Sequence, residues 1–138
     1  MTKTSVFVVD DDPSIRRSLE RLLRAAGYAV ETFASSREFI EHADIGAACC
    51  VVLDIRMPGP SGLDVLRLLE AGDHHVPVIF ITGHADVPSA QQDILARAFT
   101  VLNKPFDGEA LLSAVSRARQ LGLVWNHGAL SDSAPDQR

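Results

Sequence analysis

The segment SVFVVDDDPSIRR, Ser5 to Arg17, joins an apolar run to three consecutive aspartates and then to a proline. A short apolar run bounded by turn residues is typical of a buried strand. Asp12 followed by Pro13 is typical of a helix start, because the aspartate accepts backbone N–H groups at the N-cap and proline suits the first helical position. The segment therefore predicts a strand that leads into a helix, with Asp10 and Asp11 between them.

The same strand-then-helix pattern recurs along the chain. The other runs predicted to be strands are Tyr28 to Phe33, Cys49 to Asp54, Val76 to Thr82 and Phe99 to Asn103. Helices are predicted from apolar spacing between Pro13 and Gly27, at Ser35 to His42, after Ser61, at Pro88 to Ala98 and before Gly122. Strict alternation of this kind predicts an α/β fold, in which helices cover both faces of a parallel sheet.

Length and composition limit the domain organisation. With 138 residues, of which 46% are hydrophobic, the chain is long enough for one compact core. Residues 1–122 are predicted to form this domain, and residues 123–138 a polar tail that we expect to be mobile because it lacks hydrophobic periodicity. Cys49 and Cys50 begin a predicted strand, where alternating side chains point to opposite faces, so we interpret them as core residues rather than a disulfide.

Charge and hydropathy exclude several functional classes. The net charge of -5 offers no broad basic surface for phosphates, so we expect no direct nucleic-acid binding by this chain. No apolar run approaches the ~20 residues that span a bilayer, and the start lacks the pattern of a secretory signal. We therefore expect a cytoplasmic protein that does not contact a membrane.

Polar side chains stand where four of the predicted strands end. They are Asp10 and Asp11, Asp54, Thr82, and Lys104. In open parallel sheets ligands bind outside the carboxyl ends of the strands, so we expect these side chains at one edge.

Carboxylates ~4 Å apart repel by roughly 4 kcal/mol at an effective dielectric near 20, and a hard divalent cation would offset this repulsion. One carboxylate could then attack phosphorus, with the lysine and the hydroxyl stabilising the transferred group. If the three aspartates are considered without the other strand ends, an alternative stays open, in which they form only a helix cap and a solvated turn.

Four motifs in order, VVDDD, VVLDIRMPGPSGLDVL, FITGH and NKPF, resemble the response-regulator receiver domain, the CheY-like family of two-component signalling. The resemblance runs from about Val6 to about Gln120. It implies a flavodoxin-like (βα)5 fold, a doubly wound parallel sheet of five strands in the order 2-1-3-4-5. It also implies a signalling switch rather than an enzyme. An aspartate-nucleophile phosphatase would need a second acid where this chain has Arg56.

The resemblance also implies a role for each site residue. Asp54 would accept a phosphoryl group from a sensor histidine kinase or a phosphotransfer protein. The implied ligands of Mg²⁺ (or Mn²⁺) are Asp10, Asp11, Asp54 and the backbone carbonyl of Arg56, while the implied phosphoryl contacts are Thr82 and Lys104, with a cis peptide before Pro105. Arg56 and His84 would border the phosphoryl pocket, where they could govern the access of water to an aspartyl phosphate.

The signal output is less well defined. Receivers commonly carry an aromatic residue that moves with the switch hydroxyl, and this chain departs from that pattern with Val101 at the corresponding position. The face formed by the predicted helix at residues 88–98, the fifth strand and the last helix would bind a partner or a second copy. The alternative is a receiver-like scaffold that binds its partner regardless of phosphorylation. We expect a stand-alone regulator rather than the receiver of a longer chain.

Overall fold

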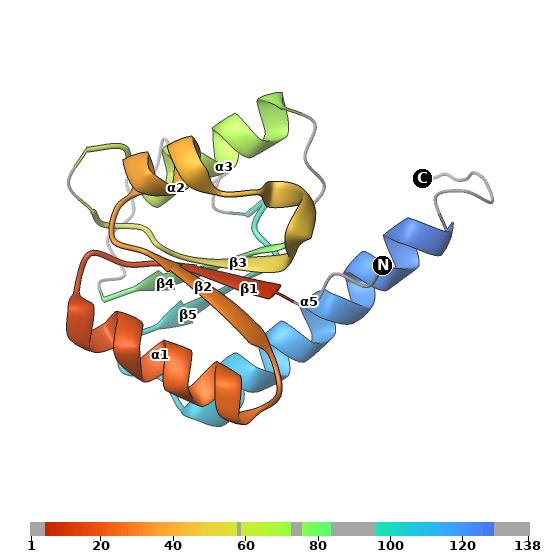
Figure 1. Cartoon of the computed structure of the whole chain (residues 1–138), viewed down its shortest axis with the longest axis horizontal. Helices are drawn as coiled ribbons and strands as arrows, with labels where there is room; N and C mark the ends of the chain where they lie inside the picture. The colour runs from red at the N-terminus through yellow and green to blue at the C-terminus, as the bar shows by residue number, and fades with distance from the viewer. Residues whose placement is uncertain (1–4, 58, 73–75, 84–95, 129–138) are drawn as a thin grey trace.

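Figure 1 shows the computed structural model of the chain, which describes residues 5–57, 59–72, 76–83 and 96–128. Its centre is a parallel sheet of five strands in the order β2-β1-β3-β4-β5. The strands are β1 (Ser5–Val9), β2 (Ala29–Phe33), β3 (Ala48–Asp54), β4 (Val78–Thr82) and β5 (Thr100–Asn103). This topology confirms the predicted flavodoxin-like fold.

Helices cover both faces of the sheet. Helices α2 (Ser36–His42) and α3 (Gly62–Ala71) lie on one face, whereas α1 (Pro13–Ala25) and α5 (Gly108–Gly128) lie on the other (Figure 1). A short 3₁₀ helix, η1 (Ile45–Ala47), leads into β3. The helix predicted at residues 88–98 lies outside the described residues as far as residue 95. Its predicted end is wrong, because residues 96–98 form a turn that leads into β5.

The helices begin where side chains satisfy their free N–H groups. One carboxylate oxygen of Asp12 accepts the N–H groups of Ser14 and Ile15 at 2.8 and 3.4 Å, so the predicted N-cap of α1 is confirmed. Ser61 and Asp64 form a reciprocal capping box at the start of α3. Gly27 follows α1 with φ +98°, a left-handed conformation that glycine adopts at low cost, so the chain turns there toward β2.

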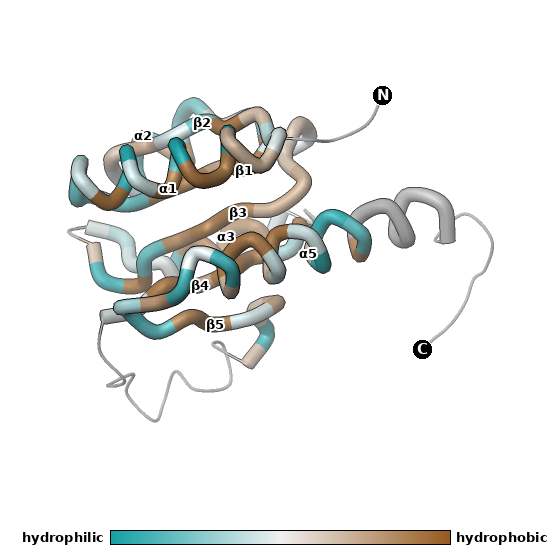
Figure 2. The backbone as a smooth tube through the Cα atoms, turned by 90° about the horizontal axis from the view of Figure 1, so that it is seen from below, coloured by the Kyte–Doolittle hydropathy of each residue, from teal (hydrophilic) through white to brown (hydrophobic). Residues whose placement is uncertain are grey.

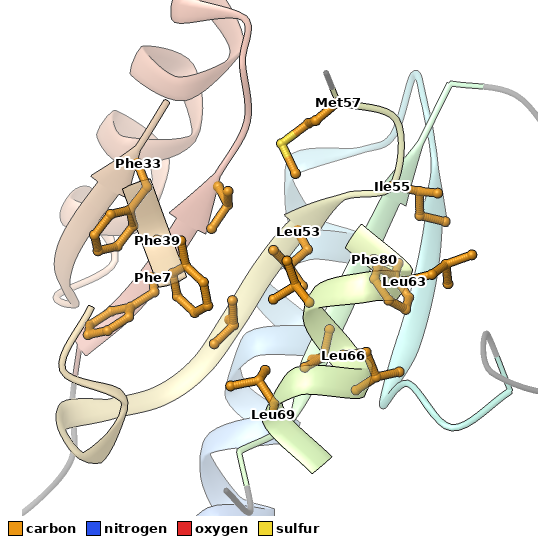
Figure 3. Packing of buried hydrophobic residues seen from close by; sticks show 14 of the residues in the cluster. Phe7, Phe33, Phe39, Leu53, Ile55, Met57, Leu63, Leu66, Leu69 and Phe80 are labelled. Atoms are coloured by element: carbon orange, nitrogen blue, oxygen red, sulfur yellow. The ribbon is translucent and has the colours of Figure 1, made fainter. Parts of the chain in front are cut away.

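Two apolar clusters fill the layers on either side of the sheet. The central strand β3 is hydrophobic along most of its length (Figure 2), and β1 and β3 are buried along almost their whole length. Under α2 and α3, Phe7, Phe33 and Phe39 point toward one another, with ring centroids 5.3 to 6.3 Å apart (Figure 3). The cluster under α1 and α5 includes Leu23 and Leu111. The sheet is therefore held on both faces, and its loop edge is free to carry polar groups.

The cysteines correct one sequence-based expectation. Cys49 and Cys50 are buried free thiols, as predicted, but both belong to the cluster on the α1 and α5 side. The cause is a shift of register between β1 and β3, where Ser5 pairs with Ala48 and Val6 with Cys50. The extra residue interrupts the alternation of side chains that a regular strand imposes.

The last helix also differs from its predicted end. Helix α5 continues past Gly122 to Gly128, so the segment from residue 123 is not a tail from its first residue. A single glycine inside a helix costs only ~1 kcal/mol relative to alanine, which neighbouring helix formers can offset. Residues 129–138 fall outside the described part of the chain. Within the described residues, no helix combines the length and the hydropathy needed to cross a membrane.

Candidate functional site

Four strands deliver polar residues to one edge of the sheet. Asp10 directly follows β1, Asp54 and Thr82 are the last residues of β3 and β4, and Lys104 directly follows β5. Because the strands are parallel and adjacent, their carboxyl ends meet, and the structure brings together the residues that the sequence analysis assigned to this edge.

The carboxylates of Asp10, Asp11 and Asp54 form one acidic cluster. Each offers a ligand atom, and these three atoms lie within 4.8 Å of one another. Asp10 and Asp54 are buried, whereas Asp11 is exposed. The Asp12 N–H donates to Oδ1 of Asp10 at 2.9 Å, and the Arg56 N–H donates to Oδ1 of Asp54 at 3.0 Å. Backbone groups thus fix the two buried carboxylates, while the outer one faces solvent.

Lys104 supplies a cation on the inner side of this cluster. Its Nζ lies 3.2 Å from Oδ2 of Asp54 and 3.6 Å from Oδ2 of Asp10. Burial lowers the pKa of Lys104, but the charges of Asp10 and Asp54 outweigh burial, so the pKa is raised and the ammonium stays charged at neutral pH. The peptide bond between Lys104 and Pro105 is cis. The Lys104 N–H donates to the backbone carbonyl of Thr82 at 2.7 Å.

Asp10 is the carboxylate of the site whose charged form is disfavoured by its surroundings. Burial raises its pKa, the hydrogen bond from the Asp12 N–H lowers it, and the nearby charge of Asp54 raises it further, with a net raised pKa. Its Oδ2 atom is buried and accepts no hydrogen bond. A buried carboxylate oxygen without a donor, among other carboxylates, fits a hard divalent cation that prefers oxygen ligands. The residues present therefore suit Mg²⁺ or Mn²⁺.

The loop after β3 is held tightly against the end of its strand. The Gly62 N–H donates to the carbonyl of Ile55 at 3.0 Å. A Cβ atom at Gly62 would lie 2.7 Å from the backbone oxygen of Asp54 and 3.1 Å from the ring of Phe80. Only glycine fits this approach, so the start of α3 packs directly against the backbone that presents Asp54.

The other residues named in the sequence analysis differ in their burial, and one of them lies outside the described residues. Arg56 is exposed beside Asp54, and Met57 is buried in the α2 and α3 cluster, which agrees with a packing role. His84 lies outside the described residues. Val101, at the position where an aromatic residue is common, is half-buried against the same cluster. Thr82 is buried at the end of β4.

One residue that touches the site was missed by the sequence analysis. Arg16, on α1, donates from Nη1 to the backbone oxygen of Asp10 at 2.8 Å. The only signal in the sequence is a basic residue close to the N-terminal end of a helix, where the helix dipole disfavours positive charge.

Comparison with known proteins places the chain in a family. A model of the response regulator receiver domain matches residues 6–116. Nodulation protein W of Bradyrhizobium diazoefficiens is 44% identical over 119 residues, which cover 86% of this chain and 52% of that protein.

Solved structures agree with this assignment. The response regulator StyR superposes with a TM-score of 0.85 at 42% identity, covering 94% of this chain and 66% of that chain. The structure of FixJ-N gives a TM-score of 0.74 at 35% identity, covering 87% of this chain and 96% of that chain. The chain spans about half the length of the first curated relatives that it matches. With its acidic cluster and its sheet order, this chain belongs to the response regulator receiver domains of two-component systems.

Proposed function

We propose that Asp54 accepts a phosphoryl group, in a reaction that requires a divalent cation, and that this modification switches a partner-binding face. The donor is a sensor histidine kinase or a phosphotransfer protein. The observation that carries the proposal is the position of the Asp54 carboxylate, which lies within the cluster of Asp10 and Asp11 and 3.2 Å from the ammonium of Lys104.

Each residue has a chemical role in this proposal. A carboxylate oxygen of Asp54 forms a bond to phosphorus while the bond between phosphorus and the donor atom breaks, and the bonding electron pair leaves with the donor. Mg²⁺, when bound, neutralises charge on the phosphoryl oxygens. Lys104 pairs with a phosphoryl oxygen, since its charge is already directed at Asp54. Thr82, Arg56 and His84 retain their proposed roles as switch hydroxyl and as modulators of dephosphorylation.

The phosphoacceptor is tested with a small donor. Incubation with acetyl phosphate and Mg²⁺ should add one phosphoryl group to the wild-type protein, which mass spectrometry detects as an acid-labile mass increase. The Asp54→Asn variant should gain none, because an amide is not a nucleophile toward phosphorus. Asp44→Asn, an exposed aspartate outside the site, is the matched control and should be phosphorylated normally. Phosphorylation that persists in Asp54→Asn would contradict the assignment.

The metal is tested separately, without a phosphoryl donor. Mg²⁺ titration followed by NMR should shift the amides of the β1–α1 and β3–α3 loops. Asp11→Ala should weaken binding by tenfold or more, because it removes one of the three carboxylates that converge. Mn²⁺ should broaden the same resonances. Undiminished affinity in Asp11→Ala would show that the cluster is not the metal site.

A second candidate function is a scaffold that binds its partner independently of phosphorylation. Val101 favours it, because a small aliphatic side chain replaces the aromatic ring that commonly moves with the switch hydroxyl. Partner or self-association measured before and after acetyl phosphate treatment separates the two candidates. Association that is equal in wild type and Asp54→Asn, with and without the donor, would favour the scaffold.

A further inference from the structure

We propose that Arg16 is a positioning residue for the acidic cluster: its guanidinium holds the peptide between Asp10 and Asp11, and this contact sets the affinity for the divalent cation. The inference rests on the proposed metal-dependent function of the same site. It concerns a residue that would contact neither the metal nor the phosphoryl group.

The contact acts on the peptide plane that joins the two aspartates. Arg16 Nη1 donates to the backbone oxygen of Asp10 at 2.8 Å, and this bond is partly buried. That oxygen belongs to the planar unit that also contains the N–H of Asp11, so fixing it fixes the direction in which the chain leaves Asp10. Asp11 itself is exposed. Arg16 is therefore placed to restrain how the outer carboxylate meets the two buried ones.

The other contacts of Asp10 leave this carbonyl for Arg16. The Asp10 N–H donates to the backbone oxygen of Phe33 at 3.2 Å, and Asp10 Oδ1 accepts the Asp12 N–H at 2.9 Å. These bonds fix the amide and the side chain of Asp10, and Arg16 fixes the remaining polar group of the residue. Outer contacts of this kind orient metal ligands, and their removal typically lowers metal affinity by about 10–100-fold.

The location of Arg16 is unfavourable for the helix alone. Arg16 lies just after the first turn of α1, where the helix dipole disfavours a cation, and no acidic residue occupies that first turn. The side chain is also partly withdrawn from solvent. A residue that served only helix stability would be better placed at the other end, so the contact with Asp10 accounts for its position.

The chain contains a matched control at that other end. Arg24 also lies on α1, and it also donates from a guanidinium Nη to a backbone oxygen, that of Val30, at 3.0 Å. It pairs in addition with Glu20 at 2.9 Å. Because Arg24 is bonded to β2 rather than to the acidic turn, its loss should affect stability without affecting the cluster.

The experiment compares Arg16→Met, Arg16→Lys and Arg24→Met with the wild type in an Mg²⁺ titration followed by NMR. Arg16→Met should raise the Kd for Mg²⁺ about tenfold, and Arg16→Lys should recover part of the loss, since an ammonium can donate to the carbonyl but lacks the planar fork. Arg24→Met should stay within about twofold of wild type, although its thermal midpoint falls as it does in Arg16→Met. Metal-free hydrogen exchange at the amides of Asp11 and Asp12 should accelerate in Arg16→Met only.

Each outcome separates this inference from the proposed function. A wild-type protein that binds Mg²⁺, together with an Arg16→Met variant of equal affinity and unchanged exchange, overturns the inference and leaves the proposed function intact. A wild-type protein that binds no Mg²⁺ overturns both. If Arg16→Met does not fold, Arg16→Ala, which also lacks a donor and has a high helix propensity, decides through the same titration, and an affinity equal to that of wild type overturns the inference.

Discussion

At the scale of single residues, the site buries negative charge close to other negative charge. The side chain of Asp10 is 2% exposed and one of its oxygens accepts no hydrogen bond. A buried carboxylate is tolerated at neutral pH only when compensating charges lie nearby. Lys104 compensates in part, at 3.6 Å. A cation bound at this cluster would offset the remaining cost of burying this charge.

Asp10→Asn should stabilise the metal-free protein at neutral pH. Burial raises the folded-state pKa of Asp10 above its ordinary value of 3.8, so the folded state binds the proton more tightly than the unfolded state does. This contribution to stability is fully present below pH 3.8 and is lost as the pH rises through the folded pKa. Asparagine removes the charge and keeps an oxygen for the Asp12 N–H. Thermal unfolding at pH 7 should shift upward by about 2–5 °C, or roughly 1 kcal/mol.

The pH dependence of the stability gain distinguishes the removal of the buried charge of Asp10 from a general effect of substitution. The gain of Asp10→Asn should shrink toward zero as the pH falls well below 3.8, because both states then carry a neutral side chain. Saturating Mg²⁺ should reverse the order, since only the wild type keeps all three carboxylates. The exposed Asp44→Asn serves as the control for replacing an aspartate by an asparagine outside the site. A metal-free Asp10→Asn protein that is less stable at pH 7 would contradict the interpretation.

At the scale of secondary-structure elements, the position of α3 depends on one close approach. Gly62 begins this helix directly over the end of β3, and Phe80 of β4 lies beneath the same point. The capping box of Ser61 and Asp64 fixes the helix start, so the helix cannot move away without losing its cap. The packing of α3 and the presentation of Asp54 are therefore coupled.

Gly62→Ala should destabilise the domain by about 2 kcal/mol, the usual cost of overpacking. The added Cβ would meet the backbone oxygen of Asp54 at 2.7 Å, a distance that requires the strand end or the helix to shift. Gly46→Ala is the control, because its Cβ would meet an ordinary contact at 3.5 Å. Urea unfolding of both variants measures the difference. Equal stability of Gly62→Ala and wild type would show that the backbone at the end of β3 can shift without a measurable cost in stability.

At the scale of the whole molecule, the site is connected to the edge strand β5. Thr82 pairs with Asn103 in the sheet, and the next residue, Lys104, donates its N–H to the carbonyl of Thr82 at 2.7 Å. A phosphoryl group that draws Thr82 or Lys104 toward Asp54 would therefore pull on the end of β5. A ligand shifts such an equilibrium only through contacts that differ between the two states, and under the proposed function Thr82 and Lys104 would supply them.

Beryllofluoride, a phosphoryl mimic, should change hydrogen exchange beyond the site itself. We expect altered protection from residue 82 to residue 104, including β5 and the segment predicted as a helix at residues 88–98, because this is the proposed docking or dimerisation face. Helix α2 contacts β2, the edge strand farthest from β5, and is the internal control. Its hydrogen exchange should not change. Changes confined to residues 10–12 and 54–59 would mean that the signal does not leave by this route, and would favour the scaffold.

The sequence by itself determined the order of the strands and of the described helices along the chain, and the set of residues at the carboxyl edge. Apolar runs, the Asp12–Pro13 start and the glycine after α1 are local signals, and each acts within a few residues. The aspartates, the threonine and the lysine could be assigned to one edge because parallel strands end together. The role of each within the site came from a family resemblance rather than from the pattern.

Only the tertiary structure decided how these residues meet. The 3.2 Å contact between Lys104 and Asp54 joins residues 50 positions apart, and no periodicity encodes such a distance. The register shift beside Cys49, the extension of α5 past Gly122 and the bond from Arg16 to Asp10 were likewise absent from the pattern. The physical reason is common to all of them: local propensity selects an element, whereas its register, its end and its side-chain partners are selected by packing against segments that are distant in the chain.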